Sequence, residues 1–308
     1  MLEVSAALAP GAAAMIWYFG AGVALNMIVA AAAAIAAEAI ILRVRHVPVA
    51  RISDGSALLT GLLVGLCLPP MIELWIPAVG AVFAITLGKH LYGGLGHNPF
   101  NPAMVGYAIL IVSFPLAMSL WPAPGHATDL VETLIFKLGM QTADGIAMAT
   151  PLDAFKFRGS QTVGEFWQAS PVMGDWGGHG WLWINLGFLA GGGWLMYRGL
   201  CDRVMPAVML ATITVLAAIF YDSGSSDSLG SPLFHLLAGS TMLAAFFIIT
   251  DPVSSPNGLH ARIVYAIGIG GIIFLIRGIG AYPDGIAFAV LLMNVATPFL
   301  DQYRWRLA

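Results

Sequence analysis

Long apolar stretches separated by short polar segments dominate this sequence of 308 residues. A membrane-spanning helix needs about 20 predominantly apolar residues to cross a hydrocarbon core of about 30 Å. The third of the predicted spans is short and ends at Pro69-Pro70, which predicts a broken helix. The pattern predicts an all-α polytopic membrane protein with about ten transmembrane helices, at residues 2–19, 22–42, 56–70, 72–90, 101–121, 181–199, 204–221, 233–250, 261–279 and 283–300.

The spans fall into two groups of five with a long hydrophilic loop between them. Gly55-Ser-Ala-Leu-Leu59 in the first group matches Gly239-Ser-Thr-Met-Leu243 in the second at a separation of 184 residues, and each precedes a break that contains proline. We therefore expect two pseudo-repeated five-helix halves, 1–121 and 181–308, joined by the loop 122–180. Because five is odd, the halves would be inverted relative to each other, an architecture that places binding sites at their interface.

Composition supports the membrane assignment and excludes several functions. Hydrophobic residues make up 59% of the chain and charged residues only 9%, whereas soluble domains carry about 25% charged residues. The net charge of −3 is spread thinly, so we expect no binding of nucleic acid. Cys67 and Cys201 form no CxxC motif or Cys/His cluster, so we predict no iron–sulfur or zinc site, and no metal site or catalytic residue in this chain alone.

The distribution of Lys and Arg predicts the orientation in the membrane. With both termini inside, nine basic residues lie in or beside the inner loops and four lie outside. Three of the outer four, Lys137, Lys156 and Arg158, belong to the long loop, where the positive-inside rule is weaker. We therefore expect loop 122–180 to face outward, which in a bacterium is the periplasm, and both termini to be cytoplasmic.

Carboxylates beside or within the apolar spans form one set of candidate functional residues. Ionisable groups at membrane depth are costly and often functional. The aspartates precede or begin predicted spans, where a carboxylate also caps a helix N-terminus. Glu38 lies deeper in its span, with only Arg43 and Arg45 nearby in sequence, and snorkelling is the alternative role for it. The candidates for ion coupling are Glu38, Asp54, Asp251 and Asp284.

Glycine, proline and asparagine gather between the fourth and fifth spans, in Gly88-Lys-His-Leu-Tyr-Gly-Gly-Leu-Gly-His-Asn-Pro-Phe-Asn-Pro102. Such residues free backbone amides and carbonyls to line a cavity. A flavin or ion site is one use for them, and a tight turn between helices is the other. Lys89 could contact a ligand here or snorkel to the cytoplasmic surface. The candidate ligands in this segment are Lys89, His97, Asn98 and Asn101.

The long loop contains a threonine among small residues, in Asp144-Gly-Ile-Ala-Met-Ala-Thr150. An exposed hydroxyl with small neighbours can be esterified to a phosphate. The alternative is structural, because Thr150 directly precedes Pro151 and can begin a turn or a helix.

These motifs together resemble the NqrB/RnfD family, whose members are membrane proteins of Rnf electron-transport complexes and of sodium-translocating NADH:quinone reductases. They occur in the family's order and cover most of the chain, and the match is to the Rnf branch. The resemblance is carried by Ser53-Asp-Gly-Ser-Ala-Leu-Leu-Thr-Gly61, the segment 88–102, the segment 144–150, Thr250-Asp-Pro-Val253, Tyr282-Pro-Asp-Gly285 and Asn294.

The resemblance implies two flavins. FMN would be attached to Thr150 through a phosphoester by a flavin transferase, with Asp144, Gly145 and Ala149 completing the attachment motif. Ala147 departs from the Ser or Thr often found at its position in the family. A second, non-covalent riboflavin would lie between the helices, near the segment 88–102.

The resemblance also implies a function and partners. The Rnf members belong to ion-translocating ferredoxin:NAD oxidoreductases of the bacterial inner membrane, in which electron transfer through FMN is coupled to movement of Na⁺ or H⁺. The partners would be the lipid bilayer and other Rnf proteins, including a periplasmic FMN-bearing protein and iron–sulfur proteins. One alternative is the quinone-reductase member, NqrB, whose usual longer N-terminal extension is missing here. The others are a non-redox small-solute channel and a structural membrane anchor.

Overall fold

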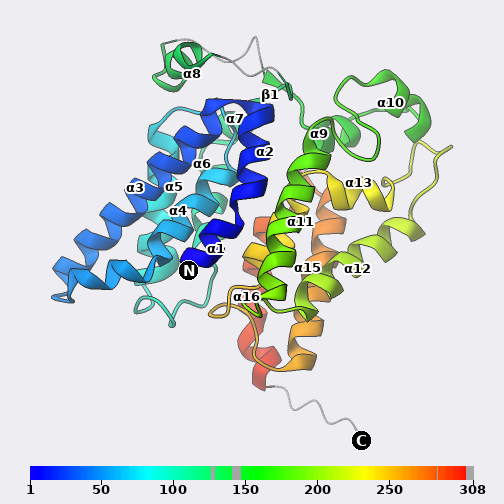
Figure 1. Ribbon diagram of the computed structural model, residues 1–308. Coiled ribbons are helices and arrows are strands. Elements are labelled where there is room, and N and C mark those ends of the chain that lie inside the picture. Colours follow the sequence, from blue (N-terminus) through cyan, green and yellow to red (C-terminus); the bar gives the residue numbers. More distant parts are fainter. Residues whose placement is uncertain (126–128, 141–146, 283, 303–308) are drawn as a thin grey trace, which may run out of the picture. The chain divides into compact units, whose positions relative to one another are not determined.

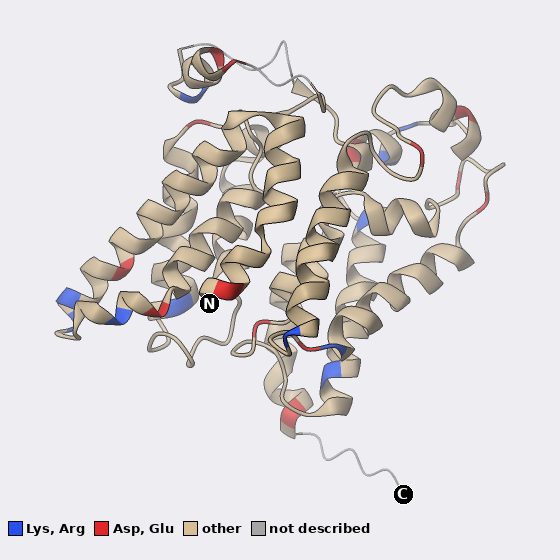
Figure 2. Ribbon diagram, in the orientation of Figure 1, with Lys and Arg blue, Asp and Glu red and all other residues tan. Residues whose placement is uncertain are grey.

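The computed structural model describes residues 1–125, 129–140, 147–282 and 284–302, and it is mostly helical (Figure 1). Each of the ten predicted spans contains helix. Charged residues lie mostly at helix ends and in loops (Figure 2). Among the described residues, the stretches long and apolar enough to cross a membrane are Leu2–Phe19, Ala21–Val44 and Leu259–Ile279, and shorter apolar helices are Ser56–Cys67, Pro102–Ser113, Val204–Ile219 and Ile286–Gln302. The fold is thus that of a helical membrane protein, and the number of crossings stays a prediction.

The chain forms two compact units, Met1–Met148 and Ala149–Ala308. The division falls inside the long loop. The elements of the first unit are α1 (Leu2–Ala7), α2 (Ala9–Phe19), α3 (Ala21–Val44), η1 (Val49–Asp54), α4 (Ser56–Cys67), α5 (Trp75–Phe83), η2 (Ala84–His90), α6 (Pro102–Ser113), α7 (Pro115–Met118), β1 (Trp121–Pro122), α8 (Leu130–Lys137) and β2 (Ala147–Met148). The strands pair antiparallel, with Trp121 opposite Met148 and Pro122 opposite Ala147.

Close packing of α4 against α3 depends on two glycines one turn apart. A Cβ on Gly61 would lie 2.5 Å from Cα of Ala31, and a Cβ on Gly65 would lie 2.6 Å from Cα of Met27. Small residues at this spacing let helix backbones approach each other, which is a main source of helix association in membranes. The pair α3–α4 therefore forms a tightly packed part of the first unit.

The predicted break after α4 is present, because residues 68–74 are not helical. Asn26 of α3 stabilises it by donating from Nδ2 to the Pro69 carbonyl at 2.9 Å. Lys137 of α8 donates from Nζ to Asn26 Oδ1 at 2.6 Å and to the Ile72 carbonyl at 3.1 Å. Side chains thus satisfy backbone carbonyls that the break removes from a helix.

The second unit contains a similar break, within the predicted span 233–250. Asn185 of α11 donates from Nδ2 to the Leu237 and Gly239 carbonyls, both at 3.0 Å, and accepts from the Met242 N–H at 3.1 Å. The elements are α9 (Pro151–Lys156), α10 (Val163–Ala169), α11 (Trp181–Tyr197), α12 (Val204–Ile219), α13 (Pro232–Leu237), α14 (Thr241–Leu243), η4 (Ala244–Ile248), α15 (Leu259–Ile279) and α16 (Ile286–Gln302).

Helix starts recur at the separation seen in the sequence. Helix α5 begins at Trp75 and α15 at Leu259, 184 residues later, and α6 and α16 begin at Pro102 and Ile286, again 184 residues apart. The recurrence extends the sequence match from a short motif to whole helices. The relative orientation of the two halves stays a prediction.

Candidate functional site

Thr150 is the N-cap of α9, and its hydroxyl is paired with a carboxylate. Its Oγ1 accepts the N–H of Asp153 at 3.2 Å and donates to Asp153 Oδ2 at 2.6 Å. Pro151 occupies the first helical position, where its missing N–H costs nothing. The helix start expected as the structural role of Thr150 is therefore present, and the partly exposed threonine also presents a hydroxyl for chemistry.

The attachment motif is described only in part. Ala149 is exposed directly before Thr150, while Ala147 belongs to β2 and pairs with Pro122. The predicted motif residues Asp144 and Gly145 lie outside the described residues.

A small apolar core holds α9 in place. Leu152 and Phe155 of α9 are buried with Phe166 of α10 and Phe234 of α13. The rings of Phe155 and Phe234 are 4.8 Å apart between centroids, and those of Phe155 and Phe166 are 6.0 Å apart. The segment that carries Thr150 is therefore anchored by its own hydrophobic core.

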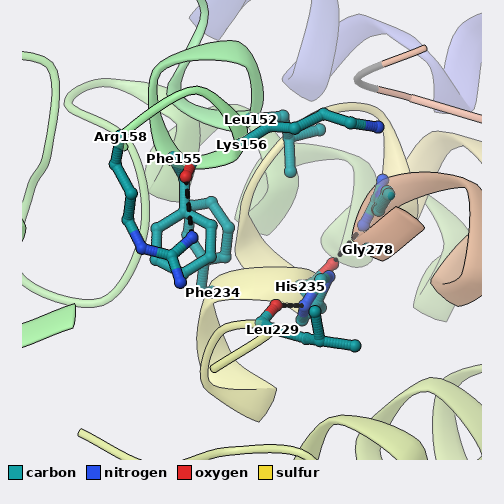
Figure 3. A pocket seen from close by; sticks show the side chains of 9 residues that line it. Leu152, Phe155, Lys156, Arg158, Leu229, Phe234, His235 and Gly278 are labelled. Carbon is teal, nitrogen blue, oxygen red and sulfur yellow. Dashed lines mark hydrogen bonds between the residues drawn. The ribbon is translucent and has the colours of Figure 1, made fainter. Parts of the chain in front are cut away.

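Two cations add to this anchoring by binding backbone carbonyls. The Arg158 guanidinium lies 4.1 Å from the centre of the Phe155 ring and donates to the Phe155 carbonyl at 2.8 Å (Figure 3). Lys156 Nζ donates to the carbonyls of Ile276 at 2.8 Å and Tyr282 at 2.7 Å. Both cations thereby tie α9 to distant parts of the second unit.

A small cavity beneath α9 has a volume of about 30 Å³. That volume holds one or two water molecules, so the ring system of a flavin cannot occupy it. Basic side chains and aromatic rings share its lining (Figure 3), which consists of Leu152, Phe155, Lys156, Arg158, Leu229, Phe234, His235, Arg277 and Gly278.

Burial raises the pKa of the Asp153 carboxyl, although the hydrogen bonds that it shares with Thr150 act in the opposite direction. Asp284 raises this pKa further, and Lys156 lowers it. Asp153 is thus a more basic carboxylate than an exposed aspartate, and it touches the hydroxyl of Thr150. The sequence contains the Thr-x-x-Asp spacing that could have revealed this pair.

A second cluster of polar side chains lies in the first unit, around Glu38. Lys89 Nζ donates to Glu38 Oε1 and to Ser56 Oγ, both at 2.6 Å. His90 Nε2 lies 3.3 Å from Glu38 Oε1. Ser56 in turn donates through Oγ to Asp54, which links two of the predicted carboxylates through hydrogen bonds.

The snorkelling suggested for Glu38 and Lys89 is wrong. Each residue is only 2% exposed, and the two charges form an ion pair inside the unit. A buried charge needs a partner because its desolvation is costly. The sequence concealed this partnership, because the two residues are 51 positions apart.

A cavity of about 790 Å³ adjoins this cluster. Its size lies within the range of small-molecule and cofactor sites. Two buried atoms of its lining residues, Glu38 Oε2 and His90 Nδ1, have no hydrogen-bond partner. The polar residues of the lining are Glu38, Arg45, Arg51, Ser53, Asp54, His90 and His97.

The four predicted flavin ligands of the segment 88–102 separate in the structure. His97 lines the cavity, whereas Lys89 is buried in the ion pair. Asn101 caps α6 by accepting the Met104 N–H at 3.2 Å, and Asn98 Nδ2 donates to a carbonyl within the turn, that of Phe100, at 3.0 Å. Both asparagines therefore support the tight turn that was the alternative to a ligand site.

Two of the predicted aspartates organise backbone turns. Asp54 Oδ1 accepts the N–H of Ser56 at 2.7 Å, as expected for a residue before a helix. Asp251 accepts from the Val253 N–H at 3.2 Å and from Ser254 Oγ at 2.9 Å. Its predicted helix-capping role is wrong, because these bonds form a turn and α15 begins only at residue 259.

Asp284 is the ion-pair partner of a buried arginine. It accepts from Nε and Nη2 of Arg277, both at 3.2 Å through Oδ1. Arg277, 5% exposed, also donates to the His235 carbonyl at 2.8 Å and to Thr241 Oγ at 3.0 Å. The sequence analysis missed Arg277, which connects α15 to both sides of the break between α13 and α14.

Known proteins match almost the whole chain. The family model described as the NQR2, RnfD, RnfE family covers residues 1–306. A protein of Ectopseudomonas mendocina, named as the D component of an ion-translocating oxidoreductase complex, is 48% identical over 98% of this chain and 89% of its own length. Proteins of the same name from Cellvibrio japonicus and Escherichia coli O1:K1 are 46% and 41% identical over 98% of this chain, and over 88% and 91% of their own lengths.

Proposed function

The chain belongs to the NQR2, RnfD, RnfE family, and we propose that it acts as the RnfD component of an ion-translocating oxidoreductase complex of the Rnf type. The observation that carries this proposal is the agreement with proteins named as that component at 41–48% identity over 98% of the chain. Activity belongs to the assembled complex, in which this membrane protein works with the other Rnf proteins. Its place would be the bacterial inner membrane, with the loop 122–180 on the periplasmic side.

The chain would relay electrons through FMN esterified to Thr150. The fit is supported by the partly exposed position of this threonine after the exposed residues Met148 and Ala149, which leaves room for a bulky group. FMN supplies redox chemistry when bound, and the protein contributes attachment and orientation. The core around Phe155 would hold the attachment point steady while the small size of Ala149 leaves access to a flavin transferase.

The cavity beside Glu38 would hold the second, non-covalent flavin. Its volume of about 790 Å³ suits a three-ring ligand, and Glu38 Oε2 and His90 Nδ1 offer unpaired polar atoms to it. Glu38 is also the strongest candidate for coupling to Na⁺ or H⁺, because it is a buried carboxylate beside this cavity. Asp54, Asp251 and Asp284 are weaker candidates, since each already accepts hydrogen bonds that organise the backbone or pair an arginine.

The test is flavin fluorescence in a denaturing gel. The whole chain is expressed with a flavin transferase, denatured in SDS and viewed under ultraviolet light, alongside Thr150→Ala and Thr162→Ala. Thr162 is a matched control, because it also caps a helix in the same loop. We expect a fluorescent band for the wild type and Thr162→Ala and a dark band for Thr150→Ala.

A dark wild-type band would overturn the FMN carrier and favour the channel alternative. Equal fluorescence of Thr150→Ala and wild type would place the flavin on another residue. Copurification of the wild type with iron–sulfur proteins would separate a member of the complex from an isolated channel.

A further inference from the structure

We propose that Asp153 is a catalytic residue for the modification of its own chain, accepting the proton of the Thr150 hydroxyl as the flavin phosphate is attached. The inference rests on the proposed function, because it requires attachment at Thr150. The flavin-accepting chain would then contribute part of the chemistry, in addition to presenting a hydroxyl to the flavin transferase.

The geometry at Thr150 is that of a nucleophile and its base. A hydroxyl has one proton and two lone pairs. The proton points to Asp153 Oδ2 at 2.6 Å, and one lone pair accepts the Asp153 N–H at 3.2 Å. The second lone pair is left for the bond to phosphorus. A base within 2.6–3.2 Å of the proton that it removes satisfies the distance required for general base catalysis.

A second threonine in the same loop shows how this pair differs from an ordinary helix cap. Thr162 and Glu165 form a capping box, in which Glu165 Oε2 accepts both the N–H of Thr162 at 3.0 Å and its hydroxyl at 2.9 Å. Glu165 is exposed, and these hydrogen bonds lower its pKa. Asp153 is not part of such a box, and burial raises its pKa, so it is the stronger base of the two.

The surroundings hold the pair in a defined position. Pro151 fixes the backbone at the first helical position, and it packs so closely against Gly178 that a Cβ there would overlap its ring. Leu152, on the other side of Pro151, is buried in the core under α9. The charged groups that influence Asp153 are Asp284, which raises its pKa, and Lys156, which lowers it.

The attachment balances with a flavin dinucleotide as the donor, in which the FMN phosphate is part of a pyrophosphate. A bond forms between Thr150 Oγ and the phosphorus of FMN. The bond from that phosphorus to the bridging oxygen breaks, and a nucleoside monophosphate leaves. The hydroxyl proton passes to Asp153 Oδ2, and no electrons are exchanged.

The test measures the rate of attachment in vitro. The whole chain is purified in detergent from cells without the transferase and incubated with purified flavin transferase and the flavin dinucleotide. In-gel fluorescence then gives the initial rate, and peptide mass spectrometry gives the modified residue. A general base contributes about 10²–10⁴-fold, so we expect Asp153→Asn to slow attachment at least about 10²-fold, whereas Glu165→Gln leaves the rate unchanged.

Two further readouts separate a base from a structural role. The wild-type rate should rise with pH as the carboxyl loses its proton, and the remaining rate of Asp153→Asn should lack that rise. Asp153→Glu keeps a carboxylate and should regain at least tenfold over Asp153→Asn. Thermal unfolding in detergent checks that the variants are folded.

The outcomes distinguish the two proposals. Wild-type rate and pH profile in Asp153→Asn, with the label still on Thr150, would overturn the role of Asp153 and leave FMN attachment intact. Asp153→Glu no faster than Asp153→Asn would also overturn it. Absence of label on Thr150 in the wild type would overturn the proposed attachment itself.

Discussion

Lys89 Nζ lies 2.6 Å from Glu38 Oε1, and both side chains are buried, so that the end of η2 is joined to α3 inside the first unit. His90 lies against the same oxygen, while Glu38 Oε2 has no partner. The pair thus combines a structural contact with an unsatisfied atom beside a cavity. Such a pair is expensive to break from one side, because the remaining charge stays buried.

We predict that Lys89→Met lowers the free energy of unfolding by about 3–5 kcal/mol, because it leaves Glu38 without its cation. The double variant Glu38→Leu, Lys89→Met should lose less than Lys89→Met alone, since no uncompensated charge remains. Thermal unfolding in detergent measures both.

The half-exposed pair of Arg262 and Asp202 is the control for this prediction. Its atoms are also close, at 2.7 Å, but the arginine side chain is 36% exposed. Arg262→Met should cost about 1 kcal/mol or less. An equal loss in Lys89→Met and Arg262→Met would contradict the buried ion pair.

Adjacent glycines of α11 should respond oppositely to the same substitution. A Cβ on Gly192 would overlap the ring of Phe246, whereas a Cβ on Gly193 would meet nothing within 4 Å. We predict that Gly192→Ala destabilises the protein by about 1–3 kcal/mol through overpacking. Gly193→Ala should be neutral or stabilising by up to about 1 kcal/mol, because alanine favours a helix. Comparable melting temperatures for the two variants would show that α11 does not pack as described.

Lys137 should make stability depend on pH. Burial lowers its pKa from 10.5 to about 7. Between these two pH values the unfolded lysine is protonated and the folded one is neutral, so stability rises with pH, by up to about 1.4 kcal/mol per pH unit. Below about pH 7 the cost of burying the charge is present in full.

Lys137→Met isolates this effect, because it removes the titrating amine from an otherwise identical chain. Unfolding in detergent at about pH 7 and about pH 9, within the window between the two pKa values, should show a gain with pH for the wild type that is smaller in the variant. The same pH dependence in both proteins would assign the gain to other groups.

Arg277→Lys should not be conservative. The guanidinium reaches His235, Thr241 and Asp284 together, and a single ammonium group cannot make all of these bonds. We expect a loss of about 1–3 kcal/mol from unsatisfied buried groups. Hydrogen exchange should increase around residues 235–241 more than in α12, and unchanged protection there would contradict the role of Arg277.

The sequence by itself determined the elements and the most informative motif. Apolar stretches predicted where helices lie, Pro69-Pro70 predicted a break, and the 184-residue repeat predicted helix starts that recur at that separation. The motif before Pro151 identified Thr150. These features depend on hydrophobicity, turn chemistry and residue order, which neighbours along the chain decide.

Only the tertiary structure decided which charged groups meet. Glu38 looked like an isolated carboxylate in the sequence, and packing of η2 against α3 placed Lys89 beside it. Asp284 looked like a helix cap, and the return of α15 made it the partner of Arg277. Partnerships across many residues depend on how helices pack, and burial then decides whether a charge must be paired or can remain in water. Burial is also the reason that Asp153, three residues from Thr150, is a stronger base than Glu165 beside Thr162.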